Sequence, residues 1–539
     1  MQDITHWLEQ RQRDGAAVGV AAALVVDGRV AWMRGLGHAD RQAGLAMTPD
    51  TPVGIGSVTK TFTALAALQL HDKGVVDIDQ PVSRYLPQFR ARADGADAQR
   101  VTLARLITHS AGVPTDVFRH LDARSATYTD VVELLGDTPL AHPPGTVGLY
   151  SNTGYNLLAH ALARASGTPY PDLVKREIFA PLGMDGSGFA VDRPLPTRPR
   201  SRAYGPGGQE ATPFELRDIA SGGIHSTAAD LARYAVALMD AYHGDGSSAL
   251  RPGTVRRMFT RQGGITIDTN RKGLGWFLFS QGDAFAAYHA GSTHHANAAV
   301  LLIPERRAAA VIVANTVGSD ALCEEFAFRW LKAHGLAVSG IVPEPLGPPP
   351  AAAAVPRAVH AGFYAQKNAY ARVASVEGGL SIRQGGDTVH TVERSPGVFA
   401  APGGDAAADV YYFREVGPYH VLLRRRGERE QQLGYRVDGA PLDAVWAARL
   451  GEYSLQGDAM PGFEQLLGAT LARQEDGLPV LRVRYNTGTF VYPLLPITRD
   501  EARTGGLGPS MTGDAVRFVS DTEGEAMTYL GLSFRRIRP

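Results

Sequence analysis

The chain has 539 residues, of which 44% are hydrophobic and 20% are charged. That length exceeds one ordinary hydrophobic core, so a soluble globular protein of two or three domains is expected. Lys plus Arg and Asp plus Glu number 54 each, and this balance gives no electrostatic reason to expect a nucleic acid or an anionic membrane surface as a partner. No apolar stretch is long enough to span a bilayer.

Cys323 is the only cysteine, which excludes an intrachain disulfide and a cysteine cluster for zinc. The first residues, Met1 to Trp7, lack the basic region and apolar core of a signal peptide. A cytoplasmic protein is therefore expected if this N-terminus is native. A periplasmic or secreted protein is expected if a signal peptide has been removed.

Strands at both ends of the first part of the chain predict one antiparallel sheet. Asp27-Gly28 supplies a hairpin turn between the first two strands, and Gly335 ends the last helix. The apolar runs predict strands at residues 18–26, 30–33, 298–303 and 308–313, and a helix at 321–334. An alternating strand–helix series is absent, so the pattern favours an α+β fold over a parallel doubly wound sheet.

The first candidate for chemistry is Ser57, which follows Val53-Gly54-Ile55-Gly56 and precedes a helix predicted over residues 61–73. Because Lys60 is three residues further on, a helix places both side chains on one face. A lysine kept partly neutral by burial or nearby positive charge can accept the serine proton. Taken alone, Ser-x-x-Lys more often marks a helix N-cap serine followed by a solvated lysine. A phosphate-binding loop would need glycine where Thr59 stands.

The second candidate pair is Tyr150 and Asn152, which precede a helix predicted from about residue 155 to 165. In an extended stretch their side chains leave the same side of the chain. A tyrosinate beside lysine could act as general base and then return the proton to the leaving group. Asn152 could bind a substrate carbonyl while holding Lys60. Taken alone, the segment also fits a turn with a packed tyrosine.

The third candidate is His289-Ala290-Gly291-Ser292, just before a predicted strand. Gly291 lets a substrate approach the strand edge, and the amides of Ser57 and Ser292 could hold an oxyanion. His294 and His295 follow, but the sequence has no paired carboxylate motif or His-Glu-x-x-His helix. They are interpreted as loop or rim histidines, and no metal site is predicted.

The composition changes at a proline- and alanine-rich stretch, which predicts an extended linker over residues 341–357. We therefore expect a domain at 1–340, a β-barrel domain at 358–445 and a second β-barrel domain at 446–539. Gly362-Phe363-Tyr364 and Gly451-Glu452-Tyr453 open two segments of similar length, which suggests a duplication. A single larger β-domain is the alternative.

The ordered set of Ser-x-x-Lys, Tyr-Ser-Asn and His-x-Gly resembles the class C β-lactamase and D,D-peptidase superfamily of penicillin-recognising hydrolases. Residues 106–114 and 222–231 support the resemblance, which covers about residues 5–335. It implies an antiparallel sheet with a helical subdomain, Ser57 as the acylated nucleophile, and Lys60 and Tyr150 as the groups that share the proton. It also implies that Asn152 binds the substrate amide.

The resemblance places His289 where β-lactamases and transpeptidases carry the lysine that helps to bind the substrate carboxylate. A histidine is a poorer carboxylate anchor because it is only partly charged near neutral pH. D-aminopeptidases and several esterases of the superfamily carry such a histidine. The layout of a catalytic domain followed by two β-barrels is also similar to that of bacterial D-aminopeptidases.

In that family a loop of the last barrel reaches the active site, and residues 503–509 or the turn at 475–477 would supply it here. A mobile surface loop is the other reading of both stretches. A substrate amine would need a carboxylate nearby, which the sequence does not identify.

The sequence therefore predicts an aminopeptidase or amidase that releases N-terminal D-amino acids through an acyl-enzyme, without a metal or organic cofactor. A carboxylesterase is the first alternative, and a β-lactamase or D,D-carboxypeptidase the second. A non-catalytic binding protein on a hydrolase scaffold is the third. The expected partner is a small-molecule or short-peptide substrate, and a homodimer is considered.

Overall fold

A computed structural model describes residues 2–537, except for a set of short segments and one longer one. The residues left undescribed inside this range are 91–97, 119–122, 124–125, 137, 190–199, 212–214, 246–248, 264–271, 282–283, 294–295, 337–355, 367–368, 404–408, 427–428, 438–441, 457–465, 475–476, 486–487 and 507–511. Nearly all of the predicted linker at 341–357 therefore lies outside the described residues, as do His294 and His295.

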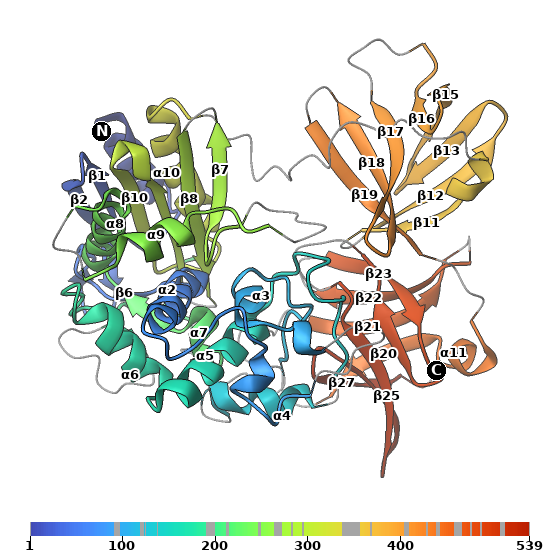
Figure 1. Cartoon of the computed structure of the whole chain (residues 1–539), viewed down its shortest axis with the longest axis horizontal. Coiled ribbons are helices and arrows are strands. Elements are labelled where there is room, and N and C mark those ends of the chain that lie inside the picture. Colours follow the sequence, from blue (N-terminus) through green and yellow to red (C-terminus); the bar gives the residue numbers. More distant parts are fainter. Residues whose placement is uncertain are drawn as a thin grey trace.

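The first unit is built on a seven-stranded antiparallel sheet (Figure 1). Its strand order is β3 (Leu45–Ala46), β2 (Arg29–Asp40), β1 (Gly19–Val26), β10 (Ala308–Ala314), β9 (Asn297–Ile303), β8 (Ala284–Ser292) and β7 (Phe277–Gln281). Asp27 and Gly28 have positive φ at the predicted hairpin turn. A small second sheet joins β4 (Val53–Gly54), β6 (Ile224–Ser226) and β5 (Gly188–Phe189).

Both faces of the large sheet are covered, which explains why its central strands are apolar without a break. Alternate residues of β1 point to opposite faces. Val20 and Leu24 pack in a cluster with Phe326 of the C-terminal helix, whereas Ala21 and Ala23 pack in the core of the helical subdomain. The predicted antiparallel sheet covered by helices is confirmed.

The helices follow the predicted periods with small differences at their ends. They are α1 (Gln2–Arg13), α2 (Thr59–Asp72), α3 (Leu103–Ile107), α4 (Val131–Leu135), α5 (Asn152–Ser166), α6 (Tyr170–Val174), α7 (Ile219–Gly222), α8 (Ala228–His243), α9 (Pro252–Met258), α10 (Asp320–Ala333) and α11 (Ala444–Ala448). Shorter helical turns are η1 (Gly56–Val58), η2 (Val82–Arg84), η3 (Ala98–Arg100), η4 (Tyr128–Asp130), η5 (Lys175–Phe179), η6 (Pro304–Arg306) and η7 (Arg357–His360).

The second unit is a nine-stranded antiparallel sheet that curls on itself. Strand β14 continues through Thr391 into β15, and the amide of Thr391 donates to the carbonyl of Leu380. The same stretch of chain therefore pairs with β13 on one side and β16 on the other. The strands are β11 (Gly362–Ala365), β12 (Tyr370–Val376), β13 (Gly379–Gln384), β14 (Asp387–His390), β15 (Val392–Ser395), β16 (Val398–Ala400), β17 (Val410–Val416), β18 (Tyr419–Arg426) and β19 (Arg429–Val437).

The third unit, called the last barrel below, is a closed antiparallel barrel. Its strands are β20 (Gly451–Leu455), β21 (Leu466–Arg473), β22 (Pro479–Tyr485), β23 (Gly488–Pro496), β24 (Glu501–Thr504), β25 (Ala515–Asp521), β26 (Gly524–Tyr529) and β27 (Leu532–Arg536). The architecture of a catalytic domain followed by antiparallel β-barrels is confirmed, while the boundaries at 340, 357 and 445 stay predictions.

The two β-units begin with the same local structure, which supports the predicted duplication. Each opens after a helical turn with a glycine of positive φ, Gly362 or Gly451. Two residues later a tyrosine hydroxyl donates to the carbonyl four residues back, at 2.8 Å for Tyr364 and 2.6 Å for Tyr453. The sequence repeat is weak because only these few positions need particular residues.

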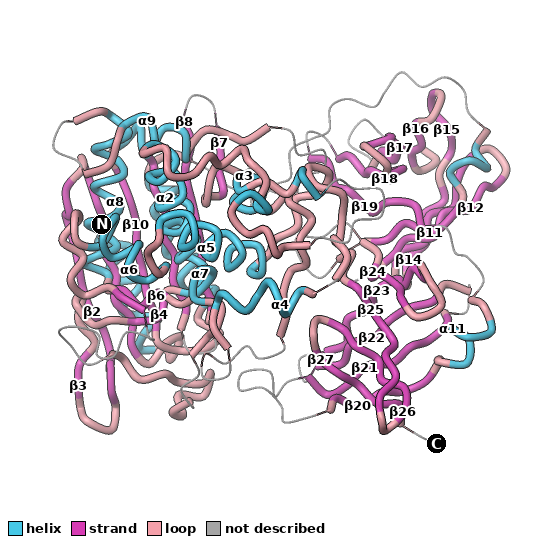
Figure 2. Tube along the Cα trace, turned by 60° about the horizontal axis from the view of Figure 1, so that its bottom comes forward, coloured by secondary structure: helices cyan, strands magenta, loops and turns pink. Residues whose placement is uncertain are grey.

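The helical subdomain of the first unit faces the β-units (Figures 1 and 2). Helix α4 lies next to the last barrel in both views, and the amide of Phe118 donates to the carbonyl of Leu530 at 2.8 Å. The side chain of Phe118 joins the core of that barrel. In the part of the chain that the structure describes, no helix is both long and apolar enough to cross a membrane.

Candidate active site

Ser57 lies in the turn η1, which runs directly into helix α2. Gly56 has φ +49, a left-handed conformation that favours glycine. The Nζ of Lys60 donates to the Oγ of Ser57 at 3.1 Å, in agreement with the predicted spacing. The hydroxyl and the amine are in direct contact, so a proton can pass between them.

Lys60 is fully buried and held at its amine by three acceptors. Besides Ser57, the Nζ donates to the Oδ1 of Asn152 at 2.7 Å and to the carbonyl of Ser221 at 2.8 Å. Burial lowers the pKa of Lys60 to about 7, although the charges of Asp116 and Asp218 oppose the shift. A neutral amine that can accept a proton is therefore well populated near pH 7.

Tyr150 packs against the same amine. The Nζ of Lys60 lies 4.7 Å from the centroid of its ring, and His109 stacks on the ring at 4.2 Å. Burial raises the pKa of Tyr150 above its usual value, and a hydrogen bond with Ser57 only partly offsets this. The phenol is therefore protonated near neutral pH, which disfavours a resident tyrosinate and fits a group that relays a proton.

The prediction that the chain is extended from Tyr150 to Asn152 is wrong at Asn152. Asn152 is the first residue of helix α5, three residues earlier than predicted. Ser151 caps this helix, because its Oγ accepts from the amide of Gly154 at 2.8 Å. Both predicted side chains nevertheless contact Lys60, because the chain turns into the helix between them.

Asp116 is a buried carboxyl group that the sequence did not single out. It accepts a hydrogen bond from the Nδ2 of Asn152 at 2.8 Å, so Asn152 joins Asp116 to Lys60. Burial raises the pKa of Asp116 to about 6, and the charge of Asp218 adds to this effect. Asp116 follows the segment 106–114, whose resemblance to the superfamily was its only signal in the sequence.

A buried ion pair holds the backbone segments next to Asp116 and Lys60. Arg217 and Asp218 contact at 2.6 Å and are almost fully buried, and Arg217 also donates to the carbonyl of Val117 at 2.8 Å. The carbonyl of Asp218 accepts from the hydroxyl of Ser221 at 3.0 Å. The pair therefore holds both the Asp116 loop and the carbonyl that binds Lys60.

The end of strand β8 lies against the turn that carries Ser57. A Cβ added at Gly291 would meet the carbonyl oxygen of Ile55 at 1.9 Å and the amide of Ser57 at 2.9 Å. A Cβ at Gly56 would meet the amide of Ser292 at 2.7 Å. Only glycines allow this approach, which places the two predicted oxyanion donors, the amides of Ser57 and Ser292, on facing backbones.

His289 is buried next to this strand edge. Its Nδ1 lies 2.7 Å from the carbonyl of Ala290, so Nδ1 carries the proton and Nε2 is left as an acceptor. Burial lowers the pKa of His289 to about 3, and the charge of Lys60 lowers it further. His289 is therefore neutral and offers no positive charge to a substrate carboxylate.

The last barrel contacts the catalytic domain next to Asp116, through the backbone of Gly513 and the carboxyl group of Asp514. A Cβ at Gly513 would meet the carbonyl of Ala141 at 2.4 Å, and the Oδ1 of Asp514 accepts from the amide of Thr115 at 3.3 Å. These residues follow the predicted loop 503–509, of which 507–509 lie outside the described residues. Of the other predicted turn, 475–477, only Gly477 is described, and it makes a local bond to Gln474.

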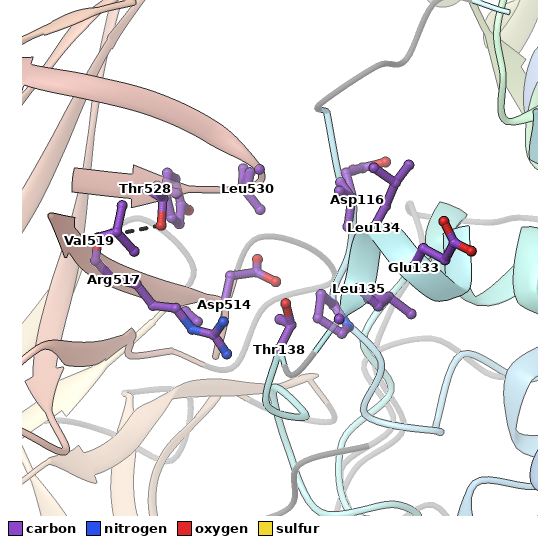
Figure 3. Close-up of a pocket in the computed structure, with 16 residues that line it drawn as sticks. Asp116, Glu133, Leu134, Leu135, Thr138, Asp514, Arg517, Val519, Thr528 and Leu530 are labelled. Atoms are coloured by element: carbon purple, nitrogen blue, oxygen red, sulfur yellow. Dashed lines mark hydrogen bonds between the residues drawn. The ribbon is translucent and has the colours of Figure 1, made fainter. Parts of the chain in front are cut away.

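A cavity of about 350 Å³ lies between the Asp116 loop and the last barrel (Figure 3). Asp116 and Asp514 reach it from opposite sides. Apolar and polar side chains complete the lining, among them Glu133, Leu134, Leu135, Thr138, Arg517 and Leu530. No cluster of three or more metal-ligating side chains occurs among the residues that the structure describes.

Comparison with known proteins gives the family. The β-lactamase family model matches residues 4–334. The chain is 30% identical over 244 residues to the putative penicillin-binding protein PbpX of Bacillus subtilis, a match covering 44% of this chain and 58% of that protein. It is 34% identical over 200 residues to the esterase EstB of Burkholderia gladioli, covering 34% of this chain and 50% of that protein.

A solved structure of SurE in complex with D-Leu shares the fold over 81% of this chain and 99% of that one, with a TM-score of 0.57 and 24% identity. The octameric penicillin-binding protein homologue of Pyrococcus abyssi covers 81% of this chain and 99% of its own, with a TM-score of 0.51 and 20% identity. With the family match over more than half of its length, the chain belongs to the β-lactamase family of serine hydrolases.

Proposed function

We propose that the protein is an aminopeptidase or amidase that releases N-terminal D-amino acids from short peptides or amides through an acyl-enzyme. The observation that carries the amine preference is Asp116, a buried carboxyl group bound to Asn152, two hydrogen bonds from the amine of Lys60. A substrate ammonium group beside Asp116 would stabilise its charged form. The neutral His289 does not itself supply a cation to bind a carboxylate.

In this mechanism neutral Lys60 takes the hydroxyl proton as the Oγ of Ser57 bonds to the substrate carbonyl carbon. The amides of Ser57 and Ser292 hold the oxyanion that forms. Tyr150 passes the proton to the leaving amine as its bond to the carbonyl carbon breaks. Water then attacks the acyl-enzyme, loses a proton through the same groups, and releases the acid and free Ser57.

The D configuration rests on the layout of a catalytic domain followed by two β-barrels, which resembles the D-aminopeptidases. It is also consistent with the D-leucine complex of SurE, the structural relative described above.

The test is hydrolysis of D-alanine p-nitroanilide beside its L-enantiomer, its N-acetyl form and p-nitrophenyl butyrate. We expect turnover of the free-amine D-anilide and a loss of at least about 1,000-fold in Ser57→Ala. Turnover of the butyrate ester without any D-anilide activity would replace the proposal with an esterase. Unchanged turnover in Ser57→Ala would remove Ser57 from the mechanism.

A carboxylesterase is the second candidate, and the match to EstB favours it. The same acylation machinery serves esters and amides, so the two candidates differ in whether the acyl group must carry an amine. β-Lactamase and D,D-carboxypeptidase activity are disfavoured by the neutral His289. A scaffold without catalysis would require that binding survive in Ser57→Ala while the wild type turns over no ester or amide.

Self-association is a separate proposal. The Pyrococcus abyssi homologue is octameric, and light scattering of this protein would show whether it is a monomer, a dimer or a larger assembly.

A further inference from the structure

The cavity between the catalytic domain and the last barrel contains a buried carboxyl group that the proposed mechanism does not use. Asp514 enters it from the barrel and is 1% exposed. Its Oδ1 accepts from the amide of Thr115, but its Oδ2 has no hydrogen-bond partner within the described part of the chain. A buried carboxyl oxygen without a partner is costly, so a bound donor would stabilise it.

We infer that this cavity is a cation-binding subsite for a basic side chain on the residue that acylates Ser57. Preferred substrates then begin with a residue such as D-lysine or D-ornithine. The inference deepens the proposed function by naming the class of acyl group. The inference depends on the proposed function for one point alone, which is that the bond cleaved in the natural substrate is an amide.

The carboxyl groups that line the cavity suit a cation, and Asp514, which is protonated near neutral pH, would ionise when the cation binds. Asp116, Asp514 and Glu133 are carboxyl groups that line it. The lining arginine, Arg517, contacts the carboxylate of Glu501 at 3.0 Å, which offsets its charge. The pKa of Asp514 is raised to about 8 by burial and by Asp116, so a bound cation would favour ionisation of the pair.

The shape of the cavity also fits. A lysine side chain is a four-carbon stem ending in an ammonium group, and Leu134, Leu135 and Leu530 offer apolar wall for such a stem. The volume of about 350 Å³ lies at the lower end of the range for small-molecule sites. In Figure 3 Asp514 stands between the barrel strands and the segment with Asp116 and Leu135.

The cavity is connected to the nucleophile through a short chain of hydrogen bonds. Ser57 contacts Lys60, Lys60 contacts Asn152, and Asn152 contacts Asp116, which lines the cavity. Asp116 is therefore the lining residue that these contacts join to Ser57, and the proposed subsite requires the acyl group to reach past it to Asp514.

The experiment compares two p-nitrophenyl esters of equal length, 6-aminohexanoate and hexanoate, which differ in a terminal ammonium group. The measured quantity is the ratio of their kcat/KM values. In the wild type we expect the ammonium ester to be favoured by about tenfold or more. In Asp514→Asn the ratio falls by about tenfold or more, as when one partner of a buried charge pair is removed.

Two further variants complete the design. Glu133→Gln changes an exposed residue at the rim, so folding is not at risk, and we expect a smaller fall of the ratio. Glu523→Gln removes the same charge from the last barrel outside the cavity, where the side chain is 78% exposed, and should leave the ratio unchanged. A ratio unaltered in Asp514→Asn, or a wild type that favours hexanoate, would overturn the subsite.

These outcomes separate the subsite from the proposed function. If D-alanine p-nitroanilide is not cleaved but the ester ratio behaves as expected, the aminopeptidase assignment fails and the subsite stands. If the anilide is cleaved but Asp514→Asn leaves the ester ratio unchanged, the aminopeptidase stands and the subsite fails.

Discussion

At the scale of single residues, the candidate site depends on removing Lys60 from water. The lysine keeps three hydrogen-bond acceptors but no surrounding solvent, and its pKa drops to about 7. The same burial keeps Tyr150 protonated and His289 neutral. One physical effect therefore sets the protonation state of all three groups.

The lowered pKa of Lys60 predicts the pH profile for a neutral ester. Below pH 7 the amine is protonated and cannot accept the serine proton, so kcat/KM for p-nitrophenyl butyrate should rise about tenfold per pH unit up to about 7 and then level off. Measuring kcat/KM for this ester from pH 5 to 9 checks the prediction, and a value that does not change with pH would contradict it.

A variant of Asp116 tests the same argument. The negative charge of Asp116 raises the pKa of Lys60 against the effect of burial. Asp116→Asn should therefore move the midpoint of the profile to lower pH, whereas Ser57→Ala should abolish the profile.

At the scale of elements, the strand β8 and the turn η1 meet without side chains between them. Gly291 and Gly56 sit at this contact, where any Cβ would overlap backbone atoms. The close approach aligns the end of a sheet with the start of helix α2. Two elements more than 200 residues apart in the sequence thereby each supply one backbone amide to the proposed oxyanion site.

Gly291→Ala should disable the enzyme. Its Cβ would lie 1.9 Å from the carbonyl oxygen of Ile55, so strand β8 must move away from Ser57. We expect kcat/KM to fall by at least about 100-fold, the size of losing one oxyanion donor. Gly253→Ala is the matched control, because nothing lies within 4 Å of its added Cβ. Equal activity of the two variants would refute the role given to the contact.

The elements were largely predictable from local patterns. Strands of the central sheet, the helix after Ser57 and the two β-unit starts at Gly362 and Gly451 follow from apolar runs and turn residues. The sequence pattern predicts the start of helix α5 three residues too late, because Tyr150-Ser151-Asn152 also fits an extended stretch. The capping role of Ser151 decides that boundary.

At the scale of the whole molecule, the catalytic domain and the last barrel share buried surface. Phe118 packs in the barrel core, and Asp514 reaches Thr115. The resemblance implied that a loop of the last barrel reaches the active site, but the sequence did not identify Asp116 or Asp514. A contact between residues 399 positions apart leaves no local pattern, and a lone aspartate in a loop has no periodicity to mark it.

The buried carboxyl of Asp514 predicts a pH-dependent stability. Its pKa is about 8 in the folded protein against a usual 3.8, so between about pH 4 and 8 the folded state binds a proton that the unfolded chain lacks. The free energy of unfolding due to this group therefore falls as pH rises.

Asp514→Asn removes this titration. The Tm of the variant relative to wild type should increase between pH 5 and 8, by about 1 °C for each 1 kcal/mol gained in a chain of 539 residues that unfolds as one unit, as measured by thermal denaturation. Glu523→Gln, at an exposed carboxylate of the same barrel, should show a constant difference from wild type. A constant difference for Asp514→Asn would contradict the raised pKa.

The order of strands in the central sheet also has a consequence for synthesis on the ribosome. Val20 of β1 pairs with Ala314 of β10, and that pair lies in the middle of the sheet. At about 5–20 residues per second, β10 is made roughly 15–60 s after β1. The hairpin of β1 and β2 therefore emerges with its apolar face uncovered and stays so until the rest of its sheet is made. A nascent chain stalled before β10 keeps this face and the open edge of β1 exposed, which makes it prone to aggregation.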